Sequence, residues 1–247
     1  MVQAVLAVAL SVGTNIGDVR LRGPVADRMD LMIRNHVEKT DPCYLSHPFH
    51  SRTETMYFHS EFWGKYMHAA PFFWKYTGNV ALKDKIARGA KDMISTQTPD
   101  GYIGYYAESK RLGSMTWDVW GCKYTMMGLL SWYDVSGDAA ALDAAVKLCD
   151  YLIAWFDPKA GHVPLHATGW VSGLASCSVM EPVVLLYERT KEPRFLEFAK
   201  YVLAESAVDN REEAKNEGPE LLESGAKGVP VADWRMTSRW GSDILAT

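Results

Sequence analysis

Residues 132–153 read WYDVSGDAAALDAAVKLCDYLI, and this stretch joins two amphipathic helices through a tight turn. The first helix is expected over 117–136 and ends before Gly137, a residue typical of the position that follows a helix. The second is expected over 139–156, after Asp138, a good N-cap residue. Its apolar residues recur at helical spacing. The stretch therefore predicts a helical hairpin.

The same pattern occurs twice more in the chain. Residues 73–94 read FWKYTGNVALKDKIARGAKDMI, and residues 186–206 read LYERTKEPRFLEFAKYVLAES. The three turns, at Gly78, Gly137 and Lys191, lie 59 and 54 residues apart, which is the length of one hairpin and its connector. Because a single hairpin cannot bury both of its faces, such units stack side by side.

Strand-like alternation is scarce, so we predict an all-α fold made of stacked helical hairpins, as in a toroid. Six hairpins close such a toroid, whereas the sequence shows about seven helices, so we expect an incomplete one. Pro71 and Pro182 fall inside expected helices and should bend them. The expected helices lie near residues 24–38, 57–77, 80–96, 117–136, 139–156, 173–190 and 194–206.

The chain is divided by composition into three parts. Residues 1–23 form an N-terminal lead-in or a degenerate signal remnant, since their apolar run lacks the basic residues of a secretory signal and is too short to span a bilayer. Residues 24–208 form the partial toroid, and residues 209–247 form an irregular C-terminal segment. The compartment is unknown from sequence, with a secreted or periplasmic location slightly favoured. No other stretch is expected to cross a membrane.

The composition favours some partners and excludes others. Net charge is −4, and acids and bases are interspersed without a Lys/Arg block, which excludes nucleic acid as a partner. Nine Trp and twelve Tyr are an unusual number of rings. Such rings fill cores, but they also suit platforms on which the apolar face of a sugar stacks. The four cysteines form no CxxC pair and are expected to be free thiols.

The segment STQTPDGYIGYY, residues 95–106, follows an expected helix and forms either a connector or the rim of a site. Asp100 and Tyr102 could face a sugar, or could cap the turn and pack in the interior. At the start of the next helix, Trp117 is a candidate stacking ring. Asp118 could accept from sugar hydroxyls or complement the helix N-terminus.

Lys123, one turn further along the same helix, is a further candidate for substrate binding. Glu61 and Lys65 have the spacing of an i,i+4 salt bridge, and their aromatic neighbours also suit a pocket wall. Glu181 lies between apolar residues, so its carboxylate must have a partner or face a cavity. We therefore include all four in the candidate substrate-binding set.

The histidines near the N-terminus have ligand types that could bind zinc. Cys43, His47 and His50 occur in CYLSHPFH, and His59 follows. Their spacing matches no standard zinc site. We therefore expect a structured loop here and no metal site in this chain.

Four ordered motifs occur along the chain: EFWGKYMHAA at 61–70, QTPDGYIGYY at 97–106, WDVWGCKYTMMGLLSWYDVSGD at 117–138 and GLASCSVMEPVVLLY at 173–187. Together they resemble the N-terminal half of the catalytic domain of the beta-L-arabinofuranosidase-like glycoside hydrolases. The resemblance extends over residues 18–206 and implies an (α/α)6 barrel with its site where the helix pairs open. It also implies hydrolysis of terminal arabinofuranose or a related sugar.

The catalytic residues are not carried over by this resemblance. It implies a zinc-held cysteine nucleophile and a glutamate acid/base, but these come from the second half of the family's catalytic domain, which nothing here matches. The catalytic residues of this chain are therefore unknown. We expect a truncated form that is inactive alone, without a cofactor of its own, with zinc belonging to the complete family enzyme. A carbohydrate is the expected partner, and a homodimer would cover apolar helix faces that a half-toroid exposes.

Two alternatives stay open at this point. One is another (α/α) toroid enzyme, an unsaturated-uronyl hydrolase or a polysaccharide lyase. The other is a non-catalytic helical-repeat module that binds glycan or protein on its concave face. The motif WDVWGCKYTMMGLL favours the arabinofuranosidase-like family over the other toroid enzymes.

Overall fold

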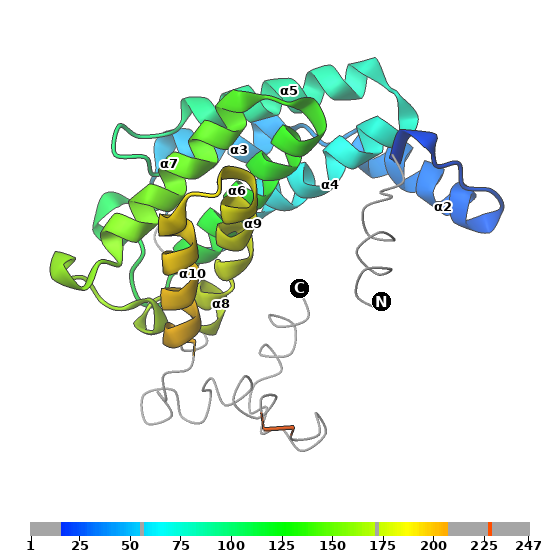
Figure 1. The fold of residues 1–247 in the computed structure, drawn as a ribbon. Coiled ribbons are helices and arrows are strands. Elements are labelled where there is room, and N and C mark those ends of the chain that lie inside the picture. Colours follow the sequence, from blue (N-terminus) through cyan, green and yellow to red (C-terminus); the bar gives the residue numbers. More distant parts are fainter. Residues whose placement is uncertain (1–15, 55–56, 171–172, 207–226, 229–247) are drawn as a thin grey trace.

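The computed structural model describes residues 16–54, 57–170, 173–206 and 227–228, and within these ranges the fold is all-α, with two isolated β-bridges and no strand. Three helical hairpins stack side by side along an open arc (Figure 1). The predicted architecture of toroid hairpins is confirmed. The hairpins are α4 (Glu61–Thr77) with α5 (Val80–Ser95), α6 (Asp118–Ser136) with α7 (Ala139–Trp155), and α9 (Met180–Thr190) with α10 (Pro193–Glu205).

The hairpin turns form for local reasons. Gly78, Gly137 and Lys191 each adopt the left-handed conformation, with φ of 68°, 75° and 59°, and each N–H donates at 2.8 Å to the carbonyl four residues earlier. This geometry ends a helix and reverses the chain. Asn79 and Asp138 then cap the second helices by accepting from backbone N–H groups. The three predicted turns are confirmed.

Helix α6 forms the centre of the arc. Residues 118–132 are buried on every side, because α4, α7 and α9 pack around the helix. Two glycines bring α4 and α6 unusually close: a Cβ on Gly64 would lie 2.1 Å from the carbonyl oxygen of Tyr124, and a Cβ on Gly128 would lie 2.8 Å from the Cβ of Met67. The interhelical distance therefore depends on the absence of side chains at these two positions.

The segment from 24 to 51 is more helical than expected. Helix α2 (Pro24–Met32) continues into a π-helical turn, η2 (Ile33–Val37), which agrees with the expected helix. The segment interpreted as a structured loop is instead helix α3 (Pro42–Ser51). Asp41 caps it by accepting from Cys43 N at 3.0 Å, and Pro42 occupies its first turn. These two helix-start residues outweigh Pro48, which lies inside the helix.

The expected helix over 173–190 is wrong as a single element. It is divided into α8 (Leu174–Cys177) and α9, separated by Ser178 and Val179. Pro182 consequently lies in the first turn of α9, where backbone N–H groups have no intrahelical partner, so it is not positioned to bend a helix interior. Short turns of 3-10 helix complete the described chain: η1 (Ile16–Asp18), η3 (Glu108–Lys110), η4 (Pro158–Ala160) and η5 (Leu165–Ala167).

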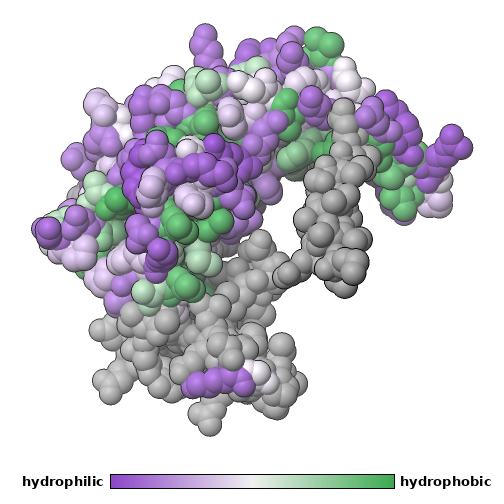
Figure 2. Space-filling model, in the orientation of Figure 1, coloured by the Kyte–Doolittle hydropathy of each residue, from purple (hydrophilic) through white to green (hydrophobic). Residues whose placement is uncertain are grey.

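The visible surface of the arc is mostly hydrophilic, with hydrophobic patches between the polar residues (Figure 2). None of the helices in the described ranges is long and apolar enough to cross a membrane. The predictions for residues 1–15, and nearly all of those for 209–247, lie outside the described residues.

The carboxylate of Asp138 stabilises the turn between α6 and α7 through two hydrogen bonds. It accepts from Ala140 N at 3.1 Å and from the indole N–H of buried Trp132 at 2.9 Å. Asp138→Ala removes the cap and leaves the indole unpaired, so the free energy of unfolding should fall by about 2–3 kcal/mol in urea titration. Asp138→Asn keeps only one acceptor and should lose about half as much. Equal losses in the two variants would contradict the expectation that each of the two hydrogen bonds contributes separately to stability.

Candidate functional site

Three aromatic rings line one side of α6 at its N-terminal end. Trp117, Trp120 and Tyr124 are arranged edge to face, with ring centroids 6.1 Å and 5.0 Å apart. Their spacing of three and four residues places them on one helix face. Trp120 and Tyr124 are buried against Ala175 of α8, whereas Trp117 is half-buried. Rings held in this way form a rigid apolar wall.

Helix α4 contributes a carboxylate and an ammonium group to this wall. The Glu61 carboxylate accepts from the indole N–H of Trp120 and lies 3.1 Å from Lys65 Nζ. The Lys65 ammonium lies 4.9 Å from the centre of the Tyr124 ring. The predicted i,i+4 salt bridge is therefore present, and it is part of the aromatic wall rather than isolated on the surface.

A second ion pair joins α6 to α9. The Lys123 side chain is buried, with 3% exposure, and its Nζ lies 3.4 Å from Glu181 Oε2. The same ammonium lies 5.1 Å and 5.0 Å from the centres of the Trp120 and Tyr124 rings. Desolvation lowers the pKa of Lys123, and the Glu181 carboxylate opposes that shift. The Glu181 side chain is 44% exposed, so it is not buried among its apolar neighbours, and it is paired with Lys123.

We call these seven residues the aromatic–ionic cluster: Glu61, Lys65, Trp117, Trp120, Lys123, Tyr124 and Glu181. It combines five of the predicted substrate-binding residues with Trp120 and Tyr124, which the sequence analysis did not select. Helical spacing from Trp117 was the available signal for both. Its two carboxylates and two ammonium groups balance in charge.

His68 lies next to this cluster on α4. Its Nδ1 is 2.8 Å from the hydroxyl oxygen of Ser131 on α6. Desolvation lowers the pKa of His68. The Glu181 carboxylate opposes this shift, and the Lys123 ammonium adds to it. Nothing in the sequence indicated this pairing, because the two residues are 63 positions apart.

Tyr102 and Asp118 lie in the interior behind the cluster. The Tyr102 hydroxyl donates to Asp118 Oδ1 at 2.8 Å, and Leu112 N donates to Oδ2 at 2.9 Å. Both side chains are fully buried, and burial raises the pKa of Asp118 to about 6 in spite of these hydrogen bonds. They therefore hold the 97–106 segment against the start of α6.

The Tyr106 hydroxyl has a similar positioning role. It accepts from Trp117 N at 2.9 Å and donates to the carbonyl of Tyr57 at 2.6 Å. The segment TPDGYIGYY thus fixes the backbone of Trp117, although its own rings face the interior.

Asp100 is exposed in the turn before Tyr102. It accepts from the Thr98 hydroxyl and lies 3.7 Å from Arg111 Nη1. The neighbouring Gln97 amide donates to the carbonyl of Ala144 at 3.0 Å, which anchors the turn to α7. The partners of Asp100 are thus Thr98 and Arg111, and neither of them belongs to the aromatic–ionic cluster.

The described residues do not fit zinc. They contain no group of three or more His, Cys, Asp or Glu side chains that could hold a metal ion. Burial also raises the pKa of the Cys122, Cys149 and Cys177 thiols, which opposes the thiolate form that zinc binds.

Comparison with solved structures gives the same fold. A GH127 beta-L-arabinofuranosidase from Geobacillus stearothermophilus T6 is similar with a TM-score of 0.62 and 15% identity over 90% of this chain and 36% of that one. A second GH127 beta-arabinofuranosidase has a TM-score of 0.59 and 16% identity, over 76% and 33% of the two chains. A glycoside hydrolase has a TM-score of 0.57 and 17% identity, over 79% and 27%. The chain spans about a third of the length of these structures.

No curated protein matches the sequence significantly. The family model described as the beta-L-arabinofuranosidase GH127 catalytic domain matches residues 26–231, which is most of the chain. This match agrees with the four sequence motifs and with the hairpin fold, and it favours the arabinofuranosidase-like family over the other toroid enzymes. This glycoside hydrolase-like chain belongs to the GH127 beta-L-arabinofuranosidase catalytic-domain family.

Proposed function

We propose that the aromatic–ionic cluster binds a terminal arabinofuranose unit of a glycan, or a closely related sugar. The observation that carries this proposal is that two ion pairs lie against an aromatic wall. One member of each pair, Lys65 or Glu181, is partly exposed. Aromatic rings offer stacking to the apolar face of a sugar, and charged groups hydrogen-bond its hydroxyls strongly. The family match supports the choice of sugar.

We assign the cluster to binding and not to bond cleavage. Glycoside hydrolysis requires a pair of carboxyl groups, or equivalent groups, on opposite sides of the scissile bond. Glu61 and Glu181 each contact a lysine of the same wall, and we assign neither an acid/base nor a nucleophile role. The chain by itself is therefore expected to bind the sugar without turning it over, and the zinc chemistry of the complete family enzyme would require other residues. The homodimer that would cover apolar helix faces of the half-toroid is a separate matter and stays a prediction.

Calorimetric titration with methyl beta-L-arabinofuranoside tests the proposal. Glu181→Gln should weaken binding about tenfold, because it replaces a charge-assisted hydrogen bond with a neutral one. The matched control is Glu197→Gln on α10, since Glu197 forms an exposed pair with Lys200 away from the cluster. This control should leave affinity unchanged.

Two results would contradict the proposal in different ways. Absence of sugar binding by the folded wild-type chain would remove the cluster as a sugar site. Turnover of p-nitrophenyl beta-L-arabinofuranoside, with or without added zinc, that is abolished by Glu181→Gln would show that the cluster carries chemistry as well as binding.

A further inference from the structure

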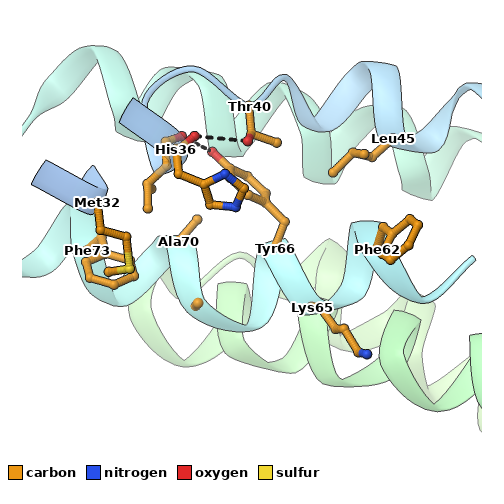
Figure 3. A pocket seen from close by; sticks show the side chains of 11 residues that line it. Met32, His36, Thr40, Leu45, Phe62, Lys65, Tyr66, Ala70 and Phe73 are labelled. Atoms are coloured by element: carbon orange, nitrogen blue, oxygen red, sulfur yellow. Dashed lines mark hydrogen bonds between the residues drawn. The ribbon is translucent and has the colours of Figure 1, made fainter. Parts of the chain in front are cut away.

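A groove of about 400 Å³ runs between α4 on one side and η2 with the start of α3 on the other. Figure 3 shows the side chains that line the groove, which come from both of its walls. Apolar and aromatic groups dominate this lining. Its principal residues are Met32, His36, Phe62, Lys65, Tyr66 and Phe73.

The hydroxyl groups in the groove are already occupied. The Thr40 hydroxyl donates to the carbonyl of His36 at 2.9 Å, and the Tyr66 hydroxyl donates to the carbonyl of Val37 at 2.9 Å. Because the protons of these two hydroxyl groups are already used, their oxygens can only accept, so a ligand rich in hydroxyl groups would regain from them only part of the hydrogen bonding that it loses with water. The groove therefore suits a flat apolar group better than a second sugar ring.

A path of aromatic rings connects the aromatic–ionic cluster to this groove. The Phe58 ring is edge-on to Trp117 at 6.3 Å and to Phe62 at 6.1 Å. Phe58 and Phe62 are 42% and 43% exposed, which is unusual for rings of this size. Lys65 also belongs to both places, since it lines the groove and its ammonium lies over the Tyr124 ring of the cluster.

We propose that the groove binds an aromatic group attached to the anomeric carbon of the sugar held in the aromatic–ionic cluster. This inference rests on the proposed function, because the cluster places the sugar and the ring path leads from it to the groove. The ligand class is thus an aryl glycoside. The groove has the size and apolar lining of small-molecule sites, which commonly measure roughly 300–1,000 Å³.

The test compares phenyl and methyl beta-L-arabinofuranoside by calorimetry on the full chain. We expect the phenyl glycoside to bind about tenfold more tightly than the methyl glycoside, because its ring is removed from water. Ala69→Phe, at an exposed position of α4 that lines the groove, should fill the space and bring the ratio of affinities to about one. Phe62→Ala should lower the ratio by removing a wall. Leu203→Ala, at an exposed apolar position on α10, is the control and should keep the wild-type ratio.

The outcomes separate this inference from the proposed function. Equal affinities for the two glycosides in the wild type, or a ratio that Ala69→Phe and Phe62→Ala leave unchanged, would overturn the groove assignment while the sugar site stands. Loss of binding of both glycosides by the folded wild type would overturn the sugar site, and the aryl site with it.

Discussion

Replacement of Gly64 by alanine is expected to lower the free energy of unfolding by about 3 kcal/mol or more, at or above the upper end of the usual cost of overpacking an interior. The new Cβ would lie 2.1 Å from the carbonyl oxygen of Tyr124, a backbone atom that no rotamer change can move. Helices α4 and α6 would have to separate, and their shared core would lose contacts. Urea unfolding followed by tryptophan fluorescence measures the loss.

Gly78→Ala is the matched control for this prediction. Gly78 has a positive φ of 68° but nothing within 4 Å of a new Cβ, so the substitution brings backbone strain without a steric clash. The expected loss is about 1 kcal/mol. Similar losses at Gly64 and Gly78 would show that the α4–α6 contact relaxes freely, against the close packing described above.

The second large effect is a pH-dependent contribution of Asp118 to stability. Burial raises the pKa of this carboxyl from 3.8 to about 6. Because the folded state holds the proton more tightly than the unfolded state, the stabilisation is complete below about pH 4 and is lost as pH rises to about 6. The shift of about two units corresponds to about 3 kcal/mol across this window.

The Asp118 contribution is isolated by comparison with Asp118→Asn. The amide does not titrate, so the free energy of unfolding of the wild type, relative to the variant, should fall between pH 4 and pH 6.5 and then level off. The amide retains one acceptor for either Tyr102 or Leu112, which limits the constant cost of the substitution. A difference that stays constant over this pH range would refute the assigned shift.

The helices and their turns could largely be predicted from the sequence. Gly78, Gly137 and Asp138 act through the conformation of one residue or through hydrogen bonds to the next turn, so their effect is visible within a few positions. The error at α3 had the same local origin. The structured loop was expected from the spacing of Cys43, His47 and His50 alone, without regard to the helix-start residues Asp41 and Pro42 just before them.

The candidate site was predictable only in part. Trp117, Lys123 and Glu181 were selected for their residue types, but neither the indole of Trp120 beside Glu61 nor the ammonium of Lys123 beside Glu181 could be foreseen. Glu61 and Trp120 are 59 positions apart in the sequence. Such pairs form only when whole helices pack, and here the packing depends on glycine contacts between α4 and α6.

The TPDGYIGYY segment shows the same division between local and tertiary information. The turn at Gly101 follows from Pro99 and glycine in the sequence, and φ there is 99°. Tyr102 and Tyr106 could have faced a sugar or the interior with the same local backbone. Packing against the start of α6 gave their hydroxyl groups protein partners, Asp118 for Tyr102 and Trp117 N for Tyr106. Short-range hydrogen bonds and turn conformations thus established the helical hairpins, while the burial of whole helix faces determined which side chains meet.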